Sequence, residues 1–158
     1  GLTLTAQHLA KAIARDGEGA NCLLEVQVLG TDTDSSARKI ARTICSSSLV
    51  KTAINGCDPN WGRIIDALGY SDAKVDEEKI DIAYSATGSK KKVFSLKRGR
   101  PTRTSFEKLC KAVQPKEFDL HINLNIGKGE AVLYAADLTE EYVDFNKGDI
   151  TDPTSLGG

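Results

Sequence analysis

The stretch FDLHINLNI, residues 118–126, carries apolar residues at every second position, from Phe118 to Ile126. Alternation with a period of two is typical of a β-strand that buries one face. A tight turn, Gly127-Lys128-Gly129, leads directly into a second apolar stretch at 131–136. Neighbouring strands joined by a tight glycine turn favour an antiparallel or mixed sheet.

The rest of the chain supplies further strands and several helices. Alternating or short apolar stretches predict strands at 24–28, 49–53, 80–84, 93–96 and 142–145. Helical spacing, with capping residues at several starts, predicts helices at 4–15, 37–44, 58–68 and 105–113. This order predicts an α+β fold, with mixed or antiparallel sheets layered with helices on one face. We expect one domain over residues 1–151, followed by a loose tail at 152–158.

Composition narrows the class of protein. The chain has 158 residues, 21 basic and 22 acidic, for a net charge of −1. With this balance the chain as a whole has no net positive charge that would attract nucleic acid or an anionic membrane. No apolar stretch approaches the length of a membrane span, so we expect no membrane association. Because the sequence has no methionine and starts at Gly1, we expect a chain that is processed or cut from a longer one.

Cysteine and histidine offer no cluster for metal binding or catalysis. No two cysteines lie two to four residues apart, so no zinc-ligand pair is present and no metal is expected. Free cysteines are among the most buried residues, and we expect reduced, partly buried thiols. His8 falls in a helical pattern and His121 on a strand, where a structural role is the favoured interpretation. The cysteines are Cys22, Cys45, Cys57 and Cys110.

Two short polar segments could form a binding site. The acidic loop 16–19 either is a plain solvated turn or directs Glu18 at an ammonium group. The segment 58–63 contains Asn60, the only tryptophan and Arg63 at a helix start. Its polar groups either cap the helix and form ion pairs at its start, or they line a pocket.

The stretch 90–103 carries seven basic residues and no acidic one. Within it, Arg98-Gly99-Arg100-Pro101 is similar to the core of an AT-hook, a short arm that inserts arginines into the minor groove. A solvated basic hairpin is the favoured interpretation, because aromatic stacking residues are scarce in the stretch. Binding of nucleic acid by a catalytically inactive module is the alternative function.

Three separated segments, taken together, resemble the ornithine acetyltransferase family, the bifunctional glutamate N-acetyltransferases of arginine biosynthesis. They are 15–20 (RDGEGA), 49–63 (from LVKTA to DPNWGR) and 137–146, where DLT is followed by Tyr142-Val143 and Asn146. The resemblance keeps its order over nearly the whole chain and ends near Thr151. It implies the α+β fold of that family.

The resemblance also implies an activity. Members cleave themselves before a threonine, which becomes the first residue of the second, or beta, chain and the nucleophile. It takes the acetyl group from N-acetylornithine and passes it to glutamate, with the terminal amine as base and an oxyanion hole stabilising the intermediate. No cofactor is implied, although acetyl-coenzyme A is a co-substrate of bifunctional members.

The nucleophile and the oxyanion hole would lie upstream of Gly1, so we predict no catalytic residue in this chain and no activity of the chain alone. The implied partners are the alpha chain and the N-terminal part of the beta chain, in a hetero-oligomer. The implied location is the cytoplasm, or the mitochondrial matrix or chloroplast in a eukaryote.

Three substrate-binding positions of the family carry over to Glu18, Asn146 and Thr151. Glu18 is suited to binding the ammonium group of ornithine through a charge-assisted hydrogen bond. Lys51, Asn60 and Arg63 are further candidates for lining the pocket. The chain departs from the family at Asn21-Cys22, where Thr-Lys is usual, and at 147–150, just before Thr151.

Overall fold

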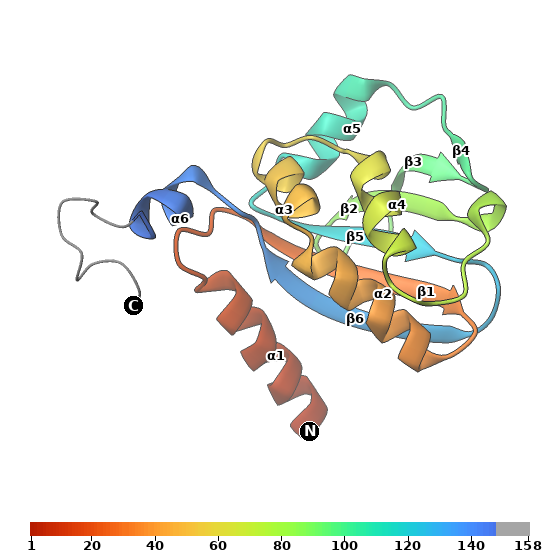
Figure 1. Cartoon of the computed structure of the whole chain (residues 1–158), viewed down its shortest axis with the longest axis horizontal. Coiled ribbons are helices and arrows are strands. Elements are labelled where there is room, and N and C mark those ends of the chain that lie inside the picture. Colours follow the sequence, from red (N-terminus) through yellow and green to blue (C-terminus); the bar gives the residue numbers. More distant parts are fainter. Residues whose placement is uncertain (148–158) are drawn as a thin grey trace.

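The computed structural model describes residues 1–147 of the chain and contains one six-stranded mixed sheet, with strand order β4-β3-β2-β5-β1-β6 (Figure 1). The strands are β1 (Leu23–Thr31), β2 (Asp81–Ala86), β3 (Val93–Lys97), β4 (Arg100–Pro101), β5 (Glu117–Asn123) and β6 (Gly129–Ala136). The helices are α1 (Leu2–Arg15), α2 (Asp34–Ser46), α3 (Ser48–Asn55), α4 (Trp61–Gly69), the 3-10 helix η1 (Glu77–Lys79), α5 (Phe106–Val113) and α6 (Glu140–Phe145). The predicted α+β class is confirmed, while the predicted tail at 152–158 lies outside the described residues.

Strand β1 has a partner on each side. It runs parallel to β5, with Val26 opposite Leu120, and antiparallel to β6, with Leu23 opposite Ala136. Strands β5 and β6 are therefore not neighbours, although only the five residues 124–128 separate them in the sequence. The predicted pairing of these two strands is wrong, whereas the predicted mixed sheet is correct.

Glycine in the β5–β6 turn explains how the chain crosses over the end of β1. The backbone of this turn lies directly against the end of β1, where Gly127 donates its N–H to the carbonyl of Gly30 at 2.9 Å. A Cβ at Gly127 would lie 2.2 Å from the carbonyl oxygen of Thr31, and one at Gly129 would lie 2.3 Å from the backbone of Thr33. Only glycine fits such an approach, so the two glycines allow β6 to reach the far side of β1.

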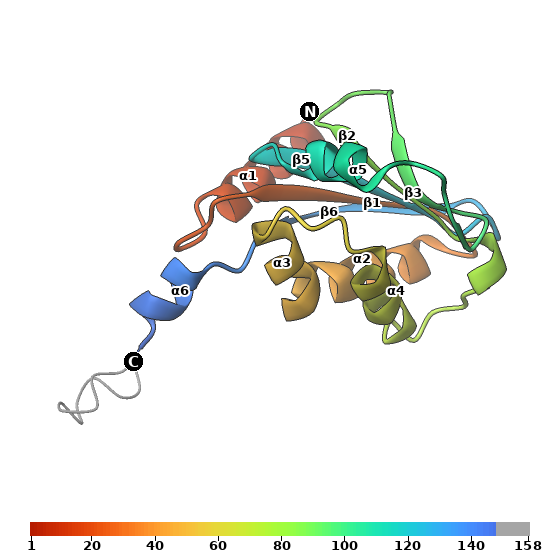
Figure 2. The ribbon, with the colours of Figure 1, turned by 90° about the horizontal axis from the view of Figure 1, so that it is seen from above.

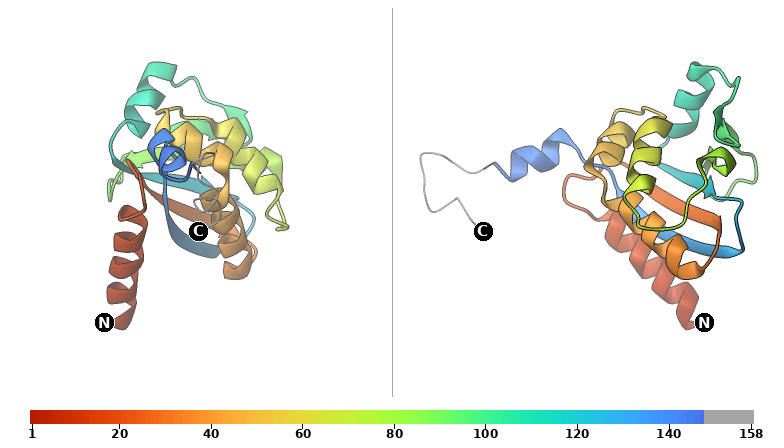
Figure 3. Two further views of the ribbon diagram at one scale, coloured as in Figure 1. Left: turned by 60° about the vertical axis from the view of Figure 1, so that its left-hand side comes forward. Right: turned by 45° about the vertical axis from the view of Figure 1, so that its right-hand side comes forward.

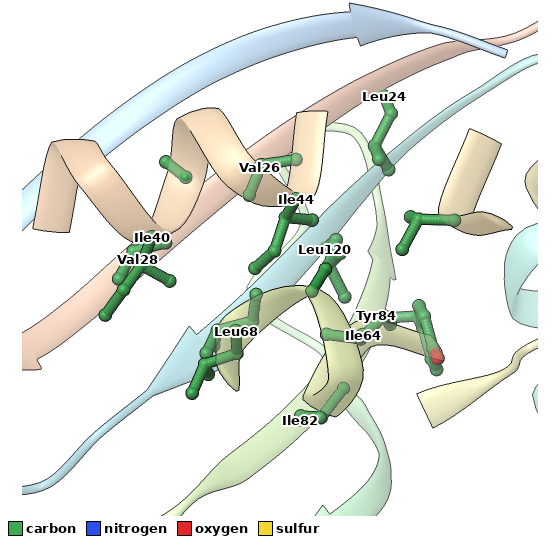
Figure 4. Close-up of a cluster of buried hydrophobic side chains, with 14 of the residues drawn as sticks. Leu24, Val26, Val28, Ile40, Ile44, Ile64, Leu68, Ile82, Tyr84 and Leu120 are labelled. Atoms are coloured by element: carbon green, nitrogen blue, oxygen red, sulfur yellow. The ribbon is translucent and has the colours of Figure 1, made fainter. Parts of the chain in front are cut away.

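The main core lies between the sheet and the helices α2, α3 and α4, which cover the same face (Figure 2). The close-up in Figure 4 shows Val26 and Val28 of β1 facing Ile40 and Ile44 of α2. The core residues of β1 and β5 alternate along the strands, and those of α2 recur at helical spacing. The fully buried aliphatic residues include Leu24, Val26, Val28, Ile40, Ile44, Leu68, Ile80, Ile82, Leu120, Ile122 and Leu124.

Helix α1 lies on the opposite face of the sheet from α2, α3 and α4 (Figure 2). Lys11 and Arg15 form ion pairs with Glu117, which alternates along β5 with the core residues Phe118 and Leu120. The prediction of helices on one face is therefore wrong for α1. This helix buries none of its residues, and two ion pairs link it to the sheet.

Two segments predicted as short strands are helices. Residues 49–53 belong to α3, where Val50, Ala53 and Ile54 are buried at helical spacing. Residues 142–145 belong to α6, which follows the capping residue Thr139. In both segments side-chain caps satisfy the first backbone N–H groups of the helix, and this outweighs the strand preference of their β-branched residues.

Two predicted boundaries also shift. Helix α4 begins at Trp61, because Asn60 accepts a hydrogen bond from the N–H of Arg63 and caps the helix. Strand β5 ends at Asn123, and Asn125 has a positive φ of 53°. Asparagine tolerates this left-handed conformation, which bends the chain before Ile126.

The second face of the sheet holds a buried polar pair. Ser85 of β2 and His121 of β5 share a hydrogen bond of 2.8 Å between Oγ and Nε2. Burial, and to a smaller extent the charge of Lys92, lowers the pKa of His121 to about 4. Burial raises the pKa of Asp119, two residues away on the same strand. The imidazole is therefore neutral at physiological pH, in agreement with a structural role.

Replacing Ile40, which is fully buried, with alanine should lower the free energy of unfolding by about 2–5 kcal/mol, because a cavity opens between α2 and β1. Ile13→Ala is the control, since Ile13 is 74% exposed. It should change the free energy of unfolding by less than about 0.5 kcal/mol. Urea denaturation of both variants measures this, and equal losses would contradict the assigned core.

The pKa of His121 makes stability depend on pH. In the unfolded chain histidine has a pKa of about 6.5, so on acidification the unfolded state takes up this proton before the folded state does. The stability contributed by neutral His121 is complete above pH 6.5 and falls towards about pH 4, by up to about 1.4 kcal/mol per pH unit.

Urea denaturation of wild type and His121→Gln from pH 7 to pH 4 tests this dependence. The difference between the two free energies of unfolding should change over this interval. Comparison with the variant is needed because the raised pKa of Asp119 acts in the opposite direction. A constant difference would refute the assignment.

Candidate substrate-binding site

The loop between α1 and β1 is held in contact with α6. Gly19 in this loop has a φ of +64°, and a Cβ there would lie 2.8 Å from the backbone nitrogen of Tyr142. Glycine is required both by the positive φ and by this close approach. The loop that carries Glu18 therefore packs against the first turn of α6, which extends away from the sheet (Figure 3).

Thr139 joins the same two elements through its hydroxyl group. The hydroxyl donates a hydrogen bond of 2.7 Å to the carbonyl of Gly19 and accepts one of 3.0 Å from the N–H of Tyr142. The second bond caps α6. One side chain thus fixes the start of the helix and ties it to the residue after Glu18.

The structure brings two of the predicted substrate-binding residues together. The side-chain amide Nδ2 of Asn146 lies 3.3 Å from the carboxylate oxygen Oε2 of Glu18, although the two residues are 128 positions apart. The same Nδ2 donates to the carbonyl of Tyr142 at 2.8 Å. Both side chains are exposed, so the pair is open to a ligand. The third predicted residue, Thr151, lies outside the described residues.

Asp137 fixes the far end of the loop. Its Oδ1 accepts hydrogen bonds of 2.9 Å from the N–H groups of both Asn21 and Cys22. Neither Asp137 nor Thr139 is predicted as a site residue from the sequence, because their partners in the loop are backbone groups 115 to 120 residues away. The only signal is that both belong to the segment 137–139, which carries part of the family resemblance.

The three predicted pocket-lining residues make hydrogen bonds away from Glu18. Asn60 caps α4 and donates to Asp58 at 2.9 Å, while Arg63 donates to the carbonyl of Leu49 at 2.9 Å. The carbonyl of Lys51 accepts the N–H of Leu138 at 3.4 Å. The structure does not bring these three side chains to Glu18, and their role as pocket lining stays a prediction.

A cleft of about 610 Å³ lies between α3 and α6, and neither Glu18 nor Asn146 is among its lining residues. Arg63 donates to the hydroxyl of Thr52, one of the lining residues, at 3.2 Å. The cleft therefore connects α6 with the segment 49–63. Its lining residues are Thr52, Asn55, Leu138, Thr139, Glu140, Val143, Asp144 and Lys147.

The residues of the basic stretch lie at both ends of β3. Lys90, Lys91 and Lys92 precede β3, and Arg98 and Arg100 flank the turn at its other end. The arginines line a cleft that also contains the half-exposed Trp61 and two acidic residues, Glu77 and Glu78. The carboxylates offset the positive charge there, which weakens the case for a nucleic-acid surface.

The thiols show no sign of catalytic activation. All four cysteines are free and partly buried, as predicted. Burial raises the pKa of Cys22 and of Cys45 to about 12, and Asp137 adds to the effect on Cys22. A thiol with a raised pKa is a poor nucleophile. Among residues 1–147, no group of three or more histidine, cysteine, aspartate or glutamate residues could hold a metal ion.

Known proteins are similar to this chain in both sequence and fold. Arginine biosynthesis bifunctional protein ArgJ from Geobacillus kaustophilus is 44% identical over 145 residues, which are 92% of this chain and 34% of that protein. The protein of the same name from Prochlorococcus marinus is 45% identical over 149 residues, 92% of this chain and 36% of that protein. The crystal structure of the Bacillus halodurans protein superposes with a TM-score of 0.84, at 44% identity, and the match covers 92% of this chain and 66% of that chain.

The fold is thus the α+β fold of a solved arginine-biosynthesis protein. The sequence pattern of the ArgJ family matches residues 1–149, and the chain belongs to that family. The resemblance inferred from the three motifs is confirmed. The chain spans about a third of the length of the curated relatives. In the described part of the chain, no helix has the length and apolarity needed to cross a bilayer.

The close approach at Gly19 makes a specific prediction. Gly19→Ala should destabilise the chain more than Gly88→Ala, because both glycines have a φ near +70° but only Gly19 faces a close neighbour. Gly88→Ala should cost only the left-handed strain, about 1–2 kcal/mol. Urea denaturation compares the two variants, and hydrogen exchange of residues 140–146 reports whether α6 loosens. Equal losses and unchanged exchange would rule out the packing at Gly19.

Proposed function

We propose that this chain is the substrate-binding portion of an acetyltransferase that moves the acetyl group of N-acetylornithine to glutamate in arginine biosynthesis. The nucleophile, a threonine freed by self-cleavage of the precursor, lies outside this chain. Membership of the ArgJ family supports the proposal, and the names of the relatives point to the same biosynthesis. The observation that carries the proposal is the contact between Glu18 and Asn146.

This pair has the chemistry needed to bind an amino-acid substrate. The carboxylate of Glu18 accepts hydrogen bonds from an ammonium group, and such charge-assisted bonds are about twice as strong as neutral ones. The amide Nδ2 of Asn146 donates to Glu18 and to the carbonyl of Tyr142, so its Oδ1 is left as an acceptor. Held 3.3 Å apart, the two side chains present carboxylate and amide oxygens to the ammonium group of one small ligand.

Exposure of the pair explains why the chain alone should be inactive. An ion pair in water contributes only about 0–1 kcal/mol, because solvent screens the charges. Strong binding of the ammonium group requires that a further segment exclude water from Glu18. We infer that this segment belongs to the portion of the relatives that this chain does not match, together with the nucleophile and the oxyanion hole.

The reaction is a covalent acyl transfer in two halves. The threonine hydroxyl attacks the acetyl carbonyl, an ester bond forms, the amide C–N bond breaks, and the proton leaves with the ornithine amine. The amine of glutamate then attacks the ester, which restores the threonine and yields N-acetylglutamate. In this scheme Glu18 and Asn146 bind and orient the substrate, and they are not the reacting groups.

The remaining expectations follow from this assignment. The partners are the alpha chain and the N-terminal part of the beta chain, in a hetero-oligomer that works in the cytoplasm or, in a eukaryote, in the mitochondrial matrix or chloroplast. No cofactor is required, and acetyl-coenzyme A is a co-substrate in bifunctional members. Acetyl transfer from N-acetylornithine to glutamate by the full-length protein tests the function directly.

Glu18→Gln in the full-length protein should raise the KM for N-acetylornithine about tenfold or more, since a tenfold change corresponds to about 1.4 kcal/mol of lost binding. Glu141→Gln is the matched control, because Glu141 is also an exposed glutamate but lies in the first turn of α6. Steady-state kinetics measure both variants. An unchanged KM would remove Glu18 from the site, and no acetyl transfer by the wild type would refute the proposed function.

A further inference from the structure

We propose that Asp137 and Thr139 are positioning residues that hold Glu18 and Asn146 in the arrangement that binds the substrate. The proposal rests on the function proposed above and adds two residues that do not themselves touch the substrate. Both side chains are buried, at 6% and 4% exposed, and both bind backbone groups of the loop that carries Glu18.

Asp137 clamps the loop where it enters β1. One carboxylate oxygen accepts the N–H groups of Asn21 and Cys22, and the backbone N–H of Asp137 donates to the carbonyl of Cys22 at 3.1 Å. Three hydrogen bonds thus join this short segment to the end of β6. Because two of them are made to a carboxylate, they are stronger than bonds between neutral groups.

Thr139 clamps the other side of the same loop. Its hydroxyl binds the carbonyl of Gly19, the residue next to Glu18, and also the N–H of Tyr142 in α6. Asn146 ends that helix and donates to the carbonyl of Tyr142. The two bonds of Thr139 therefore relate the backbone beside Glu18 to the helix that carries Asn146.

This arrangement matters because Glu18 and Asn146 lie on segments that bury few side chains of their own. Glu18 is exposed on a short loop, and Asn146 follows a helix of six residues that buries none of them. Fixing a backbone residue costs about 1–2 kcal/mol of conformational entropy. When the fold fixes the pair in advance, substrate binding does not bear this cost. Loss of the clamp, the hydrogen bonds of Asp137 and Thr139 to the loop, should therefore raise KM. It should leave kcat nearly unchanged, since the reacting groups lie elsewhere.

The second carboxylate oxygen of Asp137 is buried without a hydrogen-bond partner among the described residues. Such an atom lowers stability, because it loses its hydration and gains no bond in return. Removal of the side chain relieves this cost while it breaks the two loop bonds. We therefore expect Asp137→Ala to fold, with a loop that is no longer held.

The decisive experiment is a double-mutant cycle in the full-length protein. Asp137→Ala should raise the KM for N-acetylornithine at least tenfold and change kcat less than threefold. In the Glu18→Gln background, Asp137→Ala should raise KM less than threefold further, because its effect passes through Glu18. An unchanged KM, or an equal effect in both backgrounds, would overturn the proposal.

Asp119→Ala is the matched control for stability. Asp119 is also a buried carboxylate, with one oxygen 2.9 Å from the backbone N–H of Gly88 and the other without a partner in residues 1–147. It lies in β5 and makes no bond to the loop of Glu18. This variant should leave KM for N-acetylornithine unchanged. A rise in KM equal to that of Asp137→Ala would show a general loss of stability and overturn the proposal.

Thr139→Val and Thr139→Ser keep the test decisive if Asp137→Ala fails to fold. Valine removes the hydroxyl and should raise KM at least threefold, whereas serine keeps the hydroxyl and should restore KM to within twofold of wild type. Equal KM values in all three proteins would overturn the proposal.

Hydrogen exchange separates this proposal from the proposed function. In Asp137→Ala the amides of Asn21 and Cys22 should exchange at least tenfold faster than in the wild type, whichever substrate the protein uses. Unchanged exchange would overturn the clamp. Absence of acetyl transfer in the wild type, with faster exchange in the variant, would overturn the proposed function and retain the clamp.

Discussion

Pairing of β1 with strands on both sides is the constraint on which this structure depends. Its parallel partner β5 comes late in the sequence, after three helices that cover one face of the sheet and the β2–β4 segment. Its antiparallel partner β6 follows β5 after a short turn that crosses the end of β1. The core against α2 can form only when β1 lies between β5 and β6, because its valines provide one wall of that core.

The site follows from the same register. Since Leu23 pairs with Ala136, the loop before β1 and the segment after β6 leave the sheet at one corner. Asp137 and Thr139 are the first polar side chains beyond that corner, and both turn back to the loop. Glu18 precedes Gly19 in the loop, and Asn146 ends α6, the helix that Thr139 caps. The geometry of the pair is thus set by β-sheet pairing and by the hydrogen bonds of Asp137 and Thr139.

The sequence allowed much of the fold to be predicted, and particular residues show why the rest was missed. The alternation at 118–126 identified β5, and the spacing of Ala37, Ile40 and Ile44 identified α2, because burial imposes these periods directly. Residues 49–53 and 142–145 were wrongly predicted as strands, since short apolar segments fit either period and caps decided the outcome. Glu18 and Asn146 were selected by family resemblance, and their contact depends on a register that no local pattern encodes.

The separation of 128 residues between Glu18 and Asn146 has a consequence for folding. Local pieces of the chain cannot form this contact, because it closes one of the longest loops available and appears only after β1 and β6 have paired. A molecule that binds across the pair therefore recognises the completed fold and no partly folded form. By mass action such a ligand would stabilise the whole sheet, so that thermal unfolding shifts with ligand concentration even though binding takes place at one corner.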